Sequence, residues 1–349
     1  MKIMRVFALA MVFAGTVVGA GFASGLEIWT FFGKYGILGF GGVVLSGIII
    51  SLCGAGIIFG TYKGDFTNYR EFCNCIGGKG AGGIIMVLGS VFMLSVFCVM
   101  LAGSGALFSQ ELGYSYTSGI VFMTVICLAV FLLGMKGITA VNCLLTPLML
   151  TSITILGIFS VIYRIENVAV TYSDLLTASS SLISAIIYVS YNLLSVPPVI
   201  ISMKDLIPSG KGAVTAGLTG GIILGISGLF MYLASLTPDF SHTQLPALTL
   251  AHEISDNFSI FYGITIYIAM LTTALGSGYG FISTVMEHFP KLSRIPVAIG
   301  VCVFSASISL LGFSRLVNTL YTAIGYAAIL LTFLLISYSL KRLKKSEEN

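Results

Sequence analysis

One acidic residue, Glu27, lies well inside an apolar stretch of this 349-residue chain, and no Lys or Arg in that stretch can pair with it. Glu111 and Glu287 fall at the ends of apolar stretches, and the remaining acidic residues lie between them. A charge at the centre of a bilayer costs about 2.5–3.5 kcal/mol on insertion scales, so such a residue usually faces a cavity or a partner. We interpret Glu27 as a proton-titrating group or a contact for a substrate cation. The alternative is a hydrated carboxylate in an outer vestibule.

Two other stretches contain residues that disfavour an α-helix in the middle of an apolar run. Residues 14–25 include four glycines, each of which weakens a helix by about 1 kcal/mol. Residues 188–198 end in Pro197 and Pro198, which lack backbone donors and clash with the preceding turn. The sequence therefore predicts helix breaks in both stretches, with packing glycines and a proline kink as the alternative.

Backbone groups at such breaks could bind both ends of a small zwitterion. Where the first helix resumes after Gly21, free N–H groups carry partial positive charge, which suits a substrate carboxylate. Carbonyl groups freed by the breaks would face a substrate ammonium. We expect these carbonyls around Thr16, Val17 and Tyr188, and we expect the side chains of Tyr191, Asn192 and Ser195 to line the pocket.

The composition of the chain is that of a membrane protein, so transmembrane segments must position these residues. Apolar residues make up 57% of the chain, charged residues 9%, and the mean hydropathy is +1.03. Soluble domains carry about 25% charged residues. This excludes a soluble enzyme, a nucleic-acid-binding protein and a disordered chain, and it makes the lipid bilayer a partner. The seven cysteines form neither a disulfide framework nor a zinc site.

The apolar stretches predict ten transmembrane helices, because a bilayer needs about 20 apolar residues per helix. Lipid offers no hydrogen-bond partners, so the fold class is an all-α polytopic membrane protein. The predicted spans are 4–33, 36–62, 82–108, 117–136, 138–163, 177–203, 212–236, 258–287, 295–313 and 315–340.

Basic residues orient these spans in the membrane. With both termini cytoplasmic, fourteen of the 17 Lys and Arg residues fall on the inner side. Because short inner loops carry an excess of Lys and Arg, this distribution predicts cytoplasmic N- and C-termini in the cell membrane. Residues 1–340 form a single transmembrane domain, and residues 341–349 form a cytoplasmic tail.

The two halves of the domain have matching helix spacing. Residues 4–163 and 177–340 each hold five spans, and a repeat with an odd number of spans must enter the membrane from opposite sides. This is the inverted-repeat plan of many secondary transporters, in which paired broken helices form the substrate site. Helices one and six, which carry the two interrupted stretches, occupy equivalent places. Residues 246–252 could form a short lid helix over the outer vestibule.

The glycine-rich stretch resembles a known family. Residues 14–21, Ala-Gly-Thr-Val-Val-Gly-Ala-Gly, resemble the unwound first helix of LeuT-fold transporters of the amino acid–polyamine–organocation (APC) superfamily. The longer stretch from Gly15 to Phe32 is most similar to YkvI-type bacterial membrane proteins. The resemblance implies a five-plus-five fold over nearly the whole chain. It also implies that an amino acid carboxylate docks near Ala20 and Gly21.

A second stretch resembles the sodium site of this family. Residues 269–273, Ala-Met-Leu-Thr-Thr, fit an A-x-x-[ST]-[ST] pattern. Spacings of three and four place the carbonyl of Ala269 and the hydroxyls of Thr272 and Thr273 on one helix face, and these are ligands that a hard cation prefers. The resemblance adds the carbonyls of Gly15 and Val18 as further sodium ligands. Threonines that bond back to their own helix are the alternative.

These features favour a secondary active transporter, a sodium symporter that takes up an amino acid or a related small amine by alternating access. The alternative is a solute-sensing receptor subunit, similar to a germinant receptor, on the same scaffold. No H-E-x-x-H or G-x-S-x-G motif is present, so an enzyme is not expected and no catalytic residue is assigned. We expect no cofactor besides sodium as the coupling ion. The sequence leaves the solute and the oligomeric state open.

Overall fold

The described part of the chain is helical and contains no strand. The computed structural model describes all residues except 1, 67, 134–137, 165–174, 237–239, 241–242, 290 and 348–349, and it also leaves undescribed the side chains of 2, 133, 138–144, 164, 175–178 and 345–347. This confirms the expected all-α class within those limits.

The first half begins with three short helices, α1 (Lys2–Val17), α2 (Ala20–Ala23) and α3 (Leu26–Phe31), which together occupy the first predicted span. The elements that follow are η1 (Gly33–Leu38), α4 (Gly39–Lys63), α5 (Tyr69–Gln110), α6 (Tyr116–Leu133) and α7 (Ile138–Arg164).

The second half begins with a long helix, α8 (Leu175–Ser202), and ends with a helix that is interrupted near its start. Between them lie η3 (Lys204–Leu206), α9 (Gly210–Ser235), α10 (Pro246–Ile254), α11 (Asp256–His288) and α12 (Arg294–Ser309). The interrupted helix consists of α13 (Phe313–Leu316), a π-helix η5 (Val317–Tyr321), α14 (Thr322–Ala327) and α15 (Ile329–Glu347).

Every predicted span coincides with one of these helices or a group of them, but the count of ten spans is not confirmed. Among the described residues, six helices are long and apolar enough to cross a membrane. A seventh candidate is the pair Arg294–Ser309 and Phe313–Ala327, whose halves meet at an angle of 102°. The first span falls outside this count because it is divided into short helices.

The predicted break in helix six is wrong. The helix α8 runs without interruption from Leu175 to Ser202 and includes Pro197 and Pro198. Proline inside a transmembrane helix is tolerated where neighbouring helices and polar side chains satisfy the freed backbone groups. The proline pair therefore lies within a continuous helix, and of the two predicted breaks only the one in the first helix is present.

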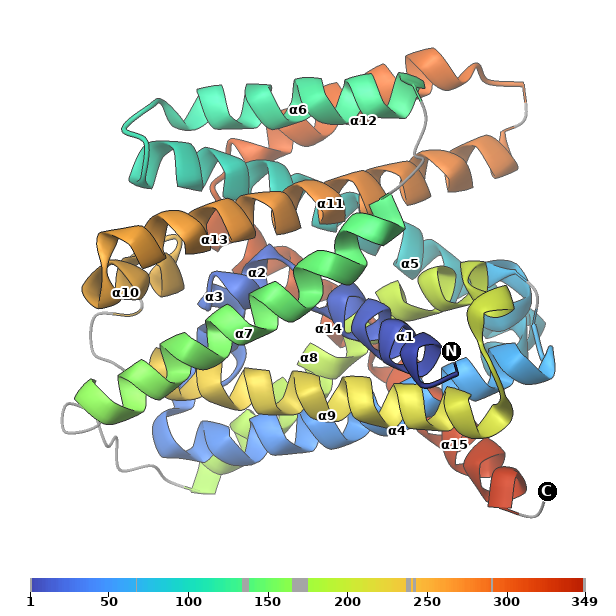
Figure 1. Cartoon of the computed structure of the whole chain (residues 1–349). Coiled ribbons are helices and arrows are strands. Elements are labelled where there is room, and N and C mark those ends of the chain that lie inside the picture. The colour runs from blue at the N-terminus through green and yellow to red at the C-terminus, as the bar shows by residue number, and fades with distance from the viewer. Residues whose placement is uncertain are drawn as a thin grey trace.

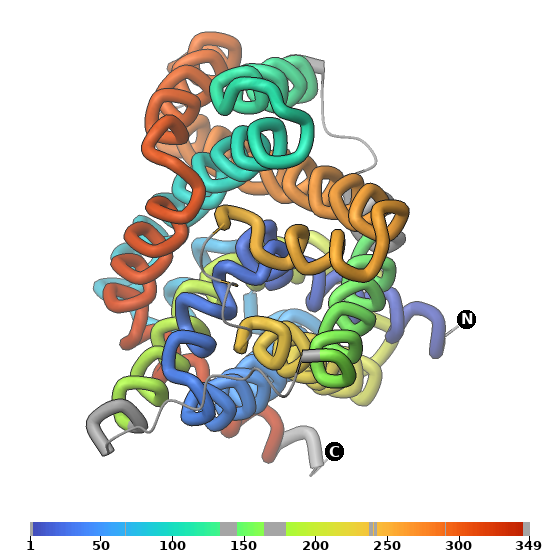
Figure 2. The backbone as a smooth tube through the Cα atoms, turned by 90° about the vertical axis from the view of Figure 1, so that its left-hand side faces the viewer, coloured from blue at the N-terminus to red at the C-terminus, as the bar shows by residue number. Residues whose placement is uncertain are grey.

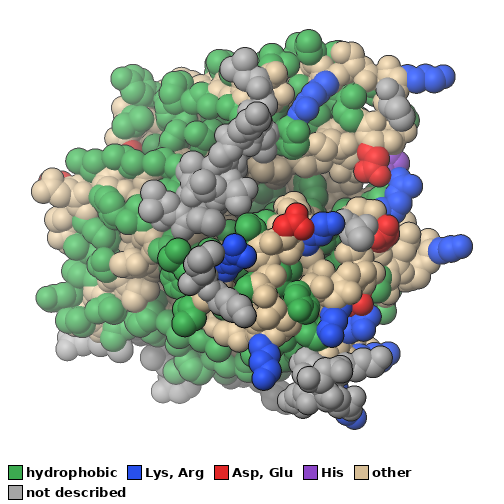
Figure 3. Space-filling view, turned by 45° about the vertical axis from the view of Figure 1, so that its right-hand side comes forward, with side chains coloured by type: hydrophobic (Ala, Val, Ile, Leu, Met, Phe, Trp, Pro, Cys, Tyr) green, Lys and Arg blue, Asp and Glu red, His purple; other side chains and the backbone are tan. Residues whose placement is uncertain are grey.

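The helices form a bundle whose two ends differ in chemistry. In Figure 1, α6 and α12 lie along one side of the bundle and α4 and α9 along the other, while α1 begins and α15 ends at the same end. Most Lys, Arg, Asp and Glu side chains in view gather toward that end, and hydrophobic side chains cover much of the remaining face (Figure 3). The view in Figure 2 shows α10 at the opposite end, across the broken first helix.

Small residues bring α4 and α9 into close contact. A Cβ atom on Gly217 of α9 would overlap the backbone of Ala55 in α4, and one on Gly221 would overlap Ser51. Small residues at helix interfaces in membranes allow this approach, since lipid provides no hydrophobic force between helices and packing must hold them together. These two glycines are therefore required by the packing of α4 against α9.

We predict that Gly217→Ala lowers the melting temperature of the detergent-solubilised protein, because the added methyl group meets backbone that cannot move aside. Gly300→Ala in α12 is the matched control, since a Cβ there meets nothing within 4 Å. Alanine favours a helix over glycine by about 1 kcal/mol, so the control is expected to melt at the same or a higher temperature. Equal effects of the two substitutions would contradict this account of the interface.

Candidate functional site

The first helix is broken twice, and both breaks are buried in the bundle. Val18 and Gly19 separate α1 from α2, with Gly19 in an extended conformation. Ser24 and Gly25 separate α2 from α3, and Gly25 has a φ of 79°, which a residue with a Cβ atom rarely adopts. The break predicted within residues 14–25 is confirmed, and the turn at Gly25 adds a second one.

The first break leaves backbone carbonyls without helical partners. Within the described part of the chain, no backbone N–H donates to the carbonyls of Val17 or Val18. The hydroxyl of Ser195 in α8 lies 3.5 Å from the carbonyl of Thr16. The structure thus brings Ser195 close to the freed carbonyls.

The second break is held by helices at the end of the bundle opposite the start of α1. The N–H of Ala247, at the start of α10, donates to the carbonyl of Ser24 at 2.8 Å. The hydroxyl of Tyr262 in α11 donates to the carbonyl of Ala23 at 2.6 Å. The helix expected at residues 246–252 is present as α10, and it contacts the broken segment through this bond from Ala247 (Figure 2).

Glu27 lies on α3 and folds back over the break instead of pointing to a hydrated vestibule. Its side chain is 2% exposed. Its carboxyl group lies against Gly21, where a Cβ atom would overlap it. The hydroxyl of Tyr191 in α8 donates to Glu27 Oε1, and the side chain of Asn192 also interacts with this carboxyl group. Glu27 therefore joins the broken helix to α8.

The remaining predicted substrate residues are all in or beside this centre. Ala20 and Gly21 are buried in α2, while Thr16 and Val17 end α1. Tyr188 is buried, but the expectation that its carbonyl is free is wrong, because the side-chain amide of Asn192 donates to it at 2.9 Å. The continuous helix α8 places Asn192 one turn after Tyr188, and this spacing permits the bond.

Tyr191, the hydrogen-bond donor to Glu27, is surrounded by other aromatic rings. The ring centroid of Tyr191 lies 5.4 Å from that of Phe31, 5.6 Å from that of Tyr188 and 5.0 Å from that of Tyr321. Phe92 of α5 completes the group at 5.7 Å from Tyr191. Phe31, Phe92 and Tyr321 were not predicted from the sequence.

Tyr321 could not have been found from spacing, because it ends the π-helix η5, whose register no apolar pattern reveals. π-helical turns are frequent at functional sites. A side-chain hydrogen bond joins η5 to the broken helix, because the hydroxyl of Thr30 in α3 donates to Asn318 Oδ1 at 2.7 Å. The broken helix, α8 and η5 thus meet around one buried carboxyl group.

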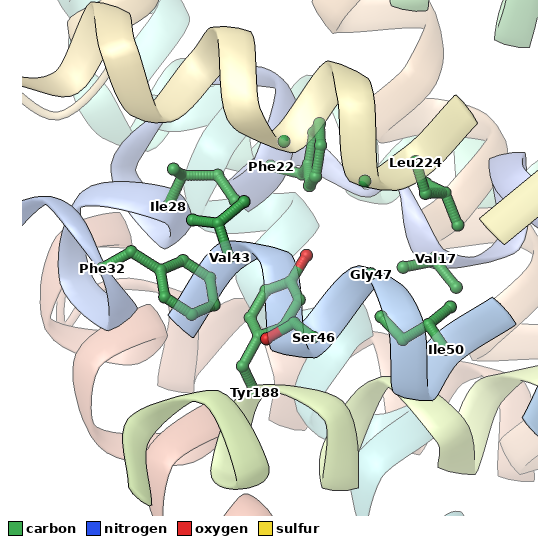
Figure 4. Close-up of a pocket in the computed structure, with 12 residues that line it drawn as sticks. Val17, Phe22, Ile28, Phe32, Val43, Ser46, Gly47, Ile50, Tyr188 and Leu224 are labelled. Atoms are coloured by element: carbon green, nitrogen blue, oxygen red, sulfur yellow. The ribbon is translucent and has the colours of Figure 1, made fainter. Parts of the chain in front are cut away.

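A small apolar cavity adjoins this centre on the side of α4 and α9. It has a volume of about 20 Å³, which is room for one water molecule. Tyr188 extends from α8 into it, toward Phe22 (Figure 4). A solute larger than water therefore needs movement of these side chains to enter.

The structure places the predicted sodium ligands on neighbouring elements. Ala269 and Thr272 are buried in α11, where the Thr272 hydroxyl donates to the Ala269 carbonyl at 3.1 Å. Thr273 follows on the same helix, which contacts α2 and α7. Gly15 packs against Thr146 of α7. No described contact joins Gly15 or Val18 to Ala269, Thr272 or Thr273, so the sodium site stays a prediction.

We predict that Tyr191 and Glu27 stabilise the protein as a pair. Tyr191→Phe and Glu27→Gln are each expected to lower the free energy of unfolding. The double variant should lose less than the two losses combined, by about 0.5–3 kcal/mol, as for residues in direct contact. Tyr262→Phe combined with Glu27→Gln is the control, and its effects should add because Tyr262 donates to Ala23 instead. Additive effects for Tyr191 and Glu27 would refute the pairing.

The fold of this bundle is that of known transporters. The chain superposes on MhsT in complex with L-phenylalanine with a TM-score of 0.65, covering 95% of this chain and 87% of that one at 17% identity. A manganese transporter of Eremococcus coleocola superposes at 0.60, with 12% identity and coverage of 93% and 76%. Mhp1, a nucleobase-cation-symport-1 family transporter with bromovinylhydantoin bound, superposes at 0.58, with 14% identity and coverage of 95% and 77%. These likenesses establish the LeuT fold.

Sequence comparison identifies nearer relatives. No protein-family model matches the chain. It is 25% identical over 335 residues to the protein YyaD of Bacillus subtilis, covering 93% of this chain and 94% of the relative. It is 31% identical over 331 residues to the membrane protein YkvI of the same organism, covering 92% of each. With this identity over almost its full length, the chain belongs to the YkvI family of membrane proteins and has the LeuT fold.

Proposed function

We propose that this protein is a secondary active transporter that moves a small solute across the cell membrane by alternating access. The observation that carries the proposal is the doubly broken first helix with a buried carboxylate folded against it. Exposing polar backbone in a membrane is costly, so non-helical backbone at this depth occurs where it is buried in protein or lines a cavity. A solute bound between the breaks and α8 would contact this non-helical backbone.

Contacts at both ends of the bundle fit such a cycle. At the outer end, α10 covers the break through the bond from Ala247 to Ser24. At the opposite end, Arg342 of α15 pairs with Asp65 after α4 at 2.7 Å, and Tyr338 donates to the same carboxylate at 2.5 Å. Opening one set of contacts while the other holds would expose the site to one side at a time. Basic residues at the second end support a cytoplasmic location for both termini.

Sodium is the coupling ion that the residues favour, which makes the protein a symporter. The ligands are the carbonyls of Gly15, Val18 and Ala269 and the hydroxyls of Thr272 and Thr273. Two observations support this assignment. A hard cation prefers oxygen ligands, and α11 lies beside α2. The transported solute is an amino acid or a related small amine. MhsT, which has the same fold, holds L-phenylalanine.

Uptake into proteoliposomes tests this function. We expect saturable uptake of labelled amino acids or amines that requires an inward sodium gradient and stops when an ionophore dissipates the gradient. Protein-free liposomes provide the background. Solute binding without uptake in any gradient would contradict the transporter, and it would indicate a receptor instead.

The sodium ligands can be tested separately. Thr273→Ala is expected to raise the sodium concentration for half-maximal uptake by about tenfold, equivalent to about 1.4 kcal/mol of ion binding. Thr284→Ala is the control on the same helix, because its hydroxyl only donates to the carbonyl of Gly280 at 3.0 Å. If Thr273→Ala leaves the sodium dependence equal to that of Thr284→Ala, the ion assignment is wrong.

A further inference from the structure

Glu27 is a buried carboxylate without a cationic partner. Among the described residues, no Lys, Arg or His forms an ion pair with Glu27. Its neighbours are a tyrosine hydroxyl and an amide. A buried charge is retained more easily when it is paired as well as hydrogen-bonded. A bound cation would supply the missing charge.

The position of Glu27 decides which end of a zwitterion can bind. A substrate carboxylate was expected at the start of α2, near Ala20 and Gly21. The structure puts the carboxyl group of Glu27 there, against the Cα atom of Gly21. A second carboxylate beside it would be repelled, and no described Lys, Arg or His in contact with Glu27 offsets that repulsion. The protein itself therefore provides the anion at the break.

The surroundings of this carboxylate suit an organic ammonium group. Tyr191, which donates to Glu27, belongs to a cluster with the rings of Phe31, Tyr188 and Tyr321, whose neighbouring centroids are 5.0–5.7 Å apart. Aromatic faces attract cations by about 2 kcal/mol or more when the site is desolvated, and they recognise alkylated ammonium ions in particular. The carbonyl of Val17 at the adjacent break can accept a hydrogen bond from an N–H group.

We propose that the site selects an organic ammonium ion that lacks a carboxylate, with Glu27 as its charge partner and the rings around Tyr191 as its wall. The inference rests on the proposed function and narrows its substrate class from amino acids and amines to amines. Glu27 takes the place that the substrate carboxylate would otherwise fill. Because the adjoining cavity holds only about 20 Å³, the ring of Tyr188, which lines it, must turn to admit the ligand.

The experiment compares amines with the amino acids from which they differ only by the carboxylate. The probes are phenethylamine with L-phenylalanine, 3-methylbutylamine with L-leucine, and ethylamine with L-alanine. Binding to the purified full-length protein is measured by calorimetry and by thermal shift, with sodium present, because ligand stabilisation follows mass action. We expect at least one amine to bind ten times or more tightly than its amino acid partner.

Variants assign this preference to the named residues. Glu27→Gln keeps the shape of the side chain and is expected to weaken amine binding tenfold or more, while amino acid binding changes less than twofold. Glu287→Gln removes a carboxylate at the bundle end, where it pairs with Arg70, and it should leave the preference unchanged. Tyr191→Leu, which removes the ring, should weaken amine binding more than Tyr191→Phe, which keeps it. Size-exclusion chromatography confirms that each variant is folded.

The outcomes separate this inference from the proposed function. If each amino acid binds as tightly as its amine, or if no amine binds, the inference is wrong, and sodium-driven uptake of amino acids would still support the transporter. If amines bind with the expected preference but no uptake occurs in proteoliposomes, the inference stands and the transporter does not. An amine preference that survives Glu27→Gln would also overturn the assignment.

Discussion

Lipid offers no hydrogen-bond partners to backbone N–H and C=O groups. The candidate site is organised by the way the protein satisfies these groups where the first helix is broken. The first helix gives up its own hydrogen bonds at Val18–Gly19 and again at Ser24–Gly25. Other elements replace part of them: Tyr262 donates to Ala23, Ala247 to Ser24, and Ser195 approaches Thr16. The carbonyls that remain, beside a buried carboxylate, are the polar groups available to a solute.

The second half is built differently. The proline pair in α8 removes two donors, but the helix continues from Leu175 to Ser202. An unbroken α8 keeps the side chains of Tyr188, Tyr191 and Asn192 at fixed spacing on the face toward Glu27. The two repeats thus contribute unequally, one with broken backbone and the other with side chains. The π-helix at Val317–Tyr321 brings in one more ring from the end of the chain.

Glu27 takes part both in the packing of the helices and in the candidate site. Gly21 leaves room for its carboxyl group, Tyr191 donates to it, and its side chain is buried. The carboxyl group is therefore part of the packing between α3 and α8 and also lies at the break. Changes in what it binds would be felt by the contacts between these helices, and this is a direct physical route from solute binding to helix movement.

The sequence alone determined the membrane class, the positions of the helices, the break within residues 14–25 and the presence of a carboxyl group, Glu27, inside the first apolar stretch. These follow from local causes: apolar length, glycine content, and the cost of a charge in lipid. The break predicted from the sequence in α8 was wrong, because whether prolines break a helix depends on the neighbouring groups that satisfy its backbone. Phe31, Phe92 and Tyr321 were not predicted either, because they come from three separate elements and no spacing along the chain records that they meet. Only the tertiary structure decided that the carboxylate of Glu27 lies against Gly21, because that contact depends on the turn at Gly25 and on the packing of α3 against α8.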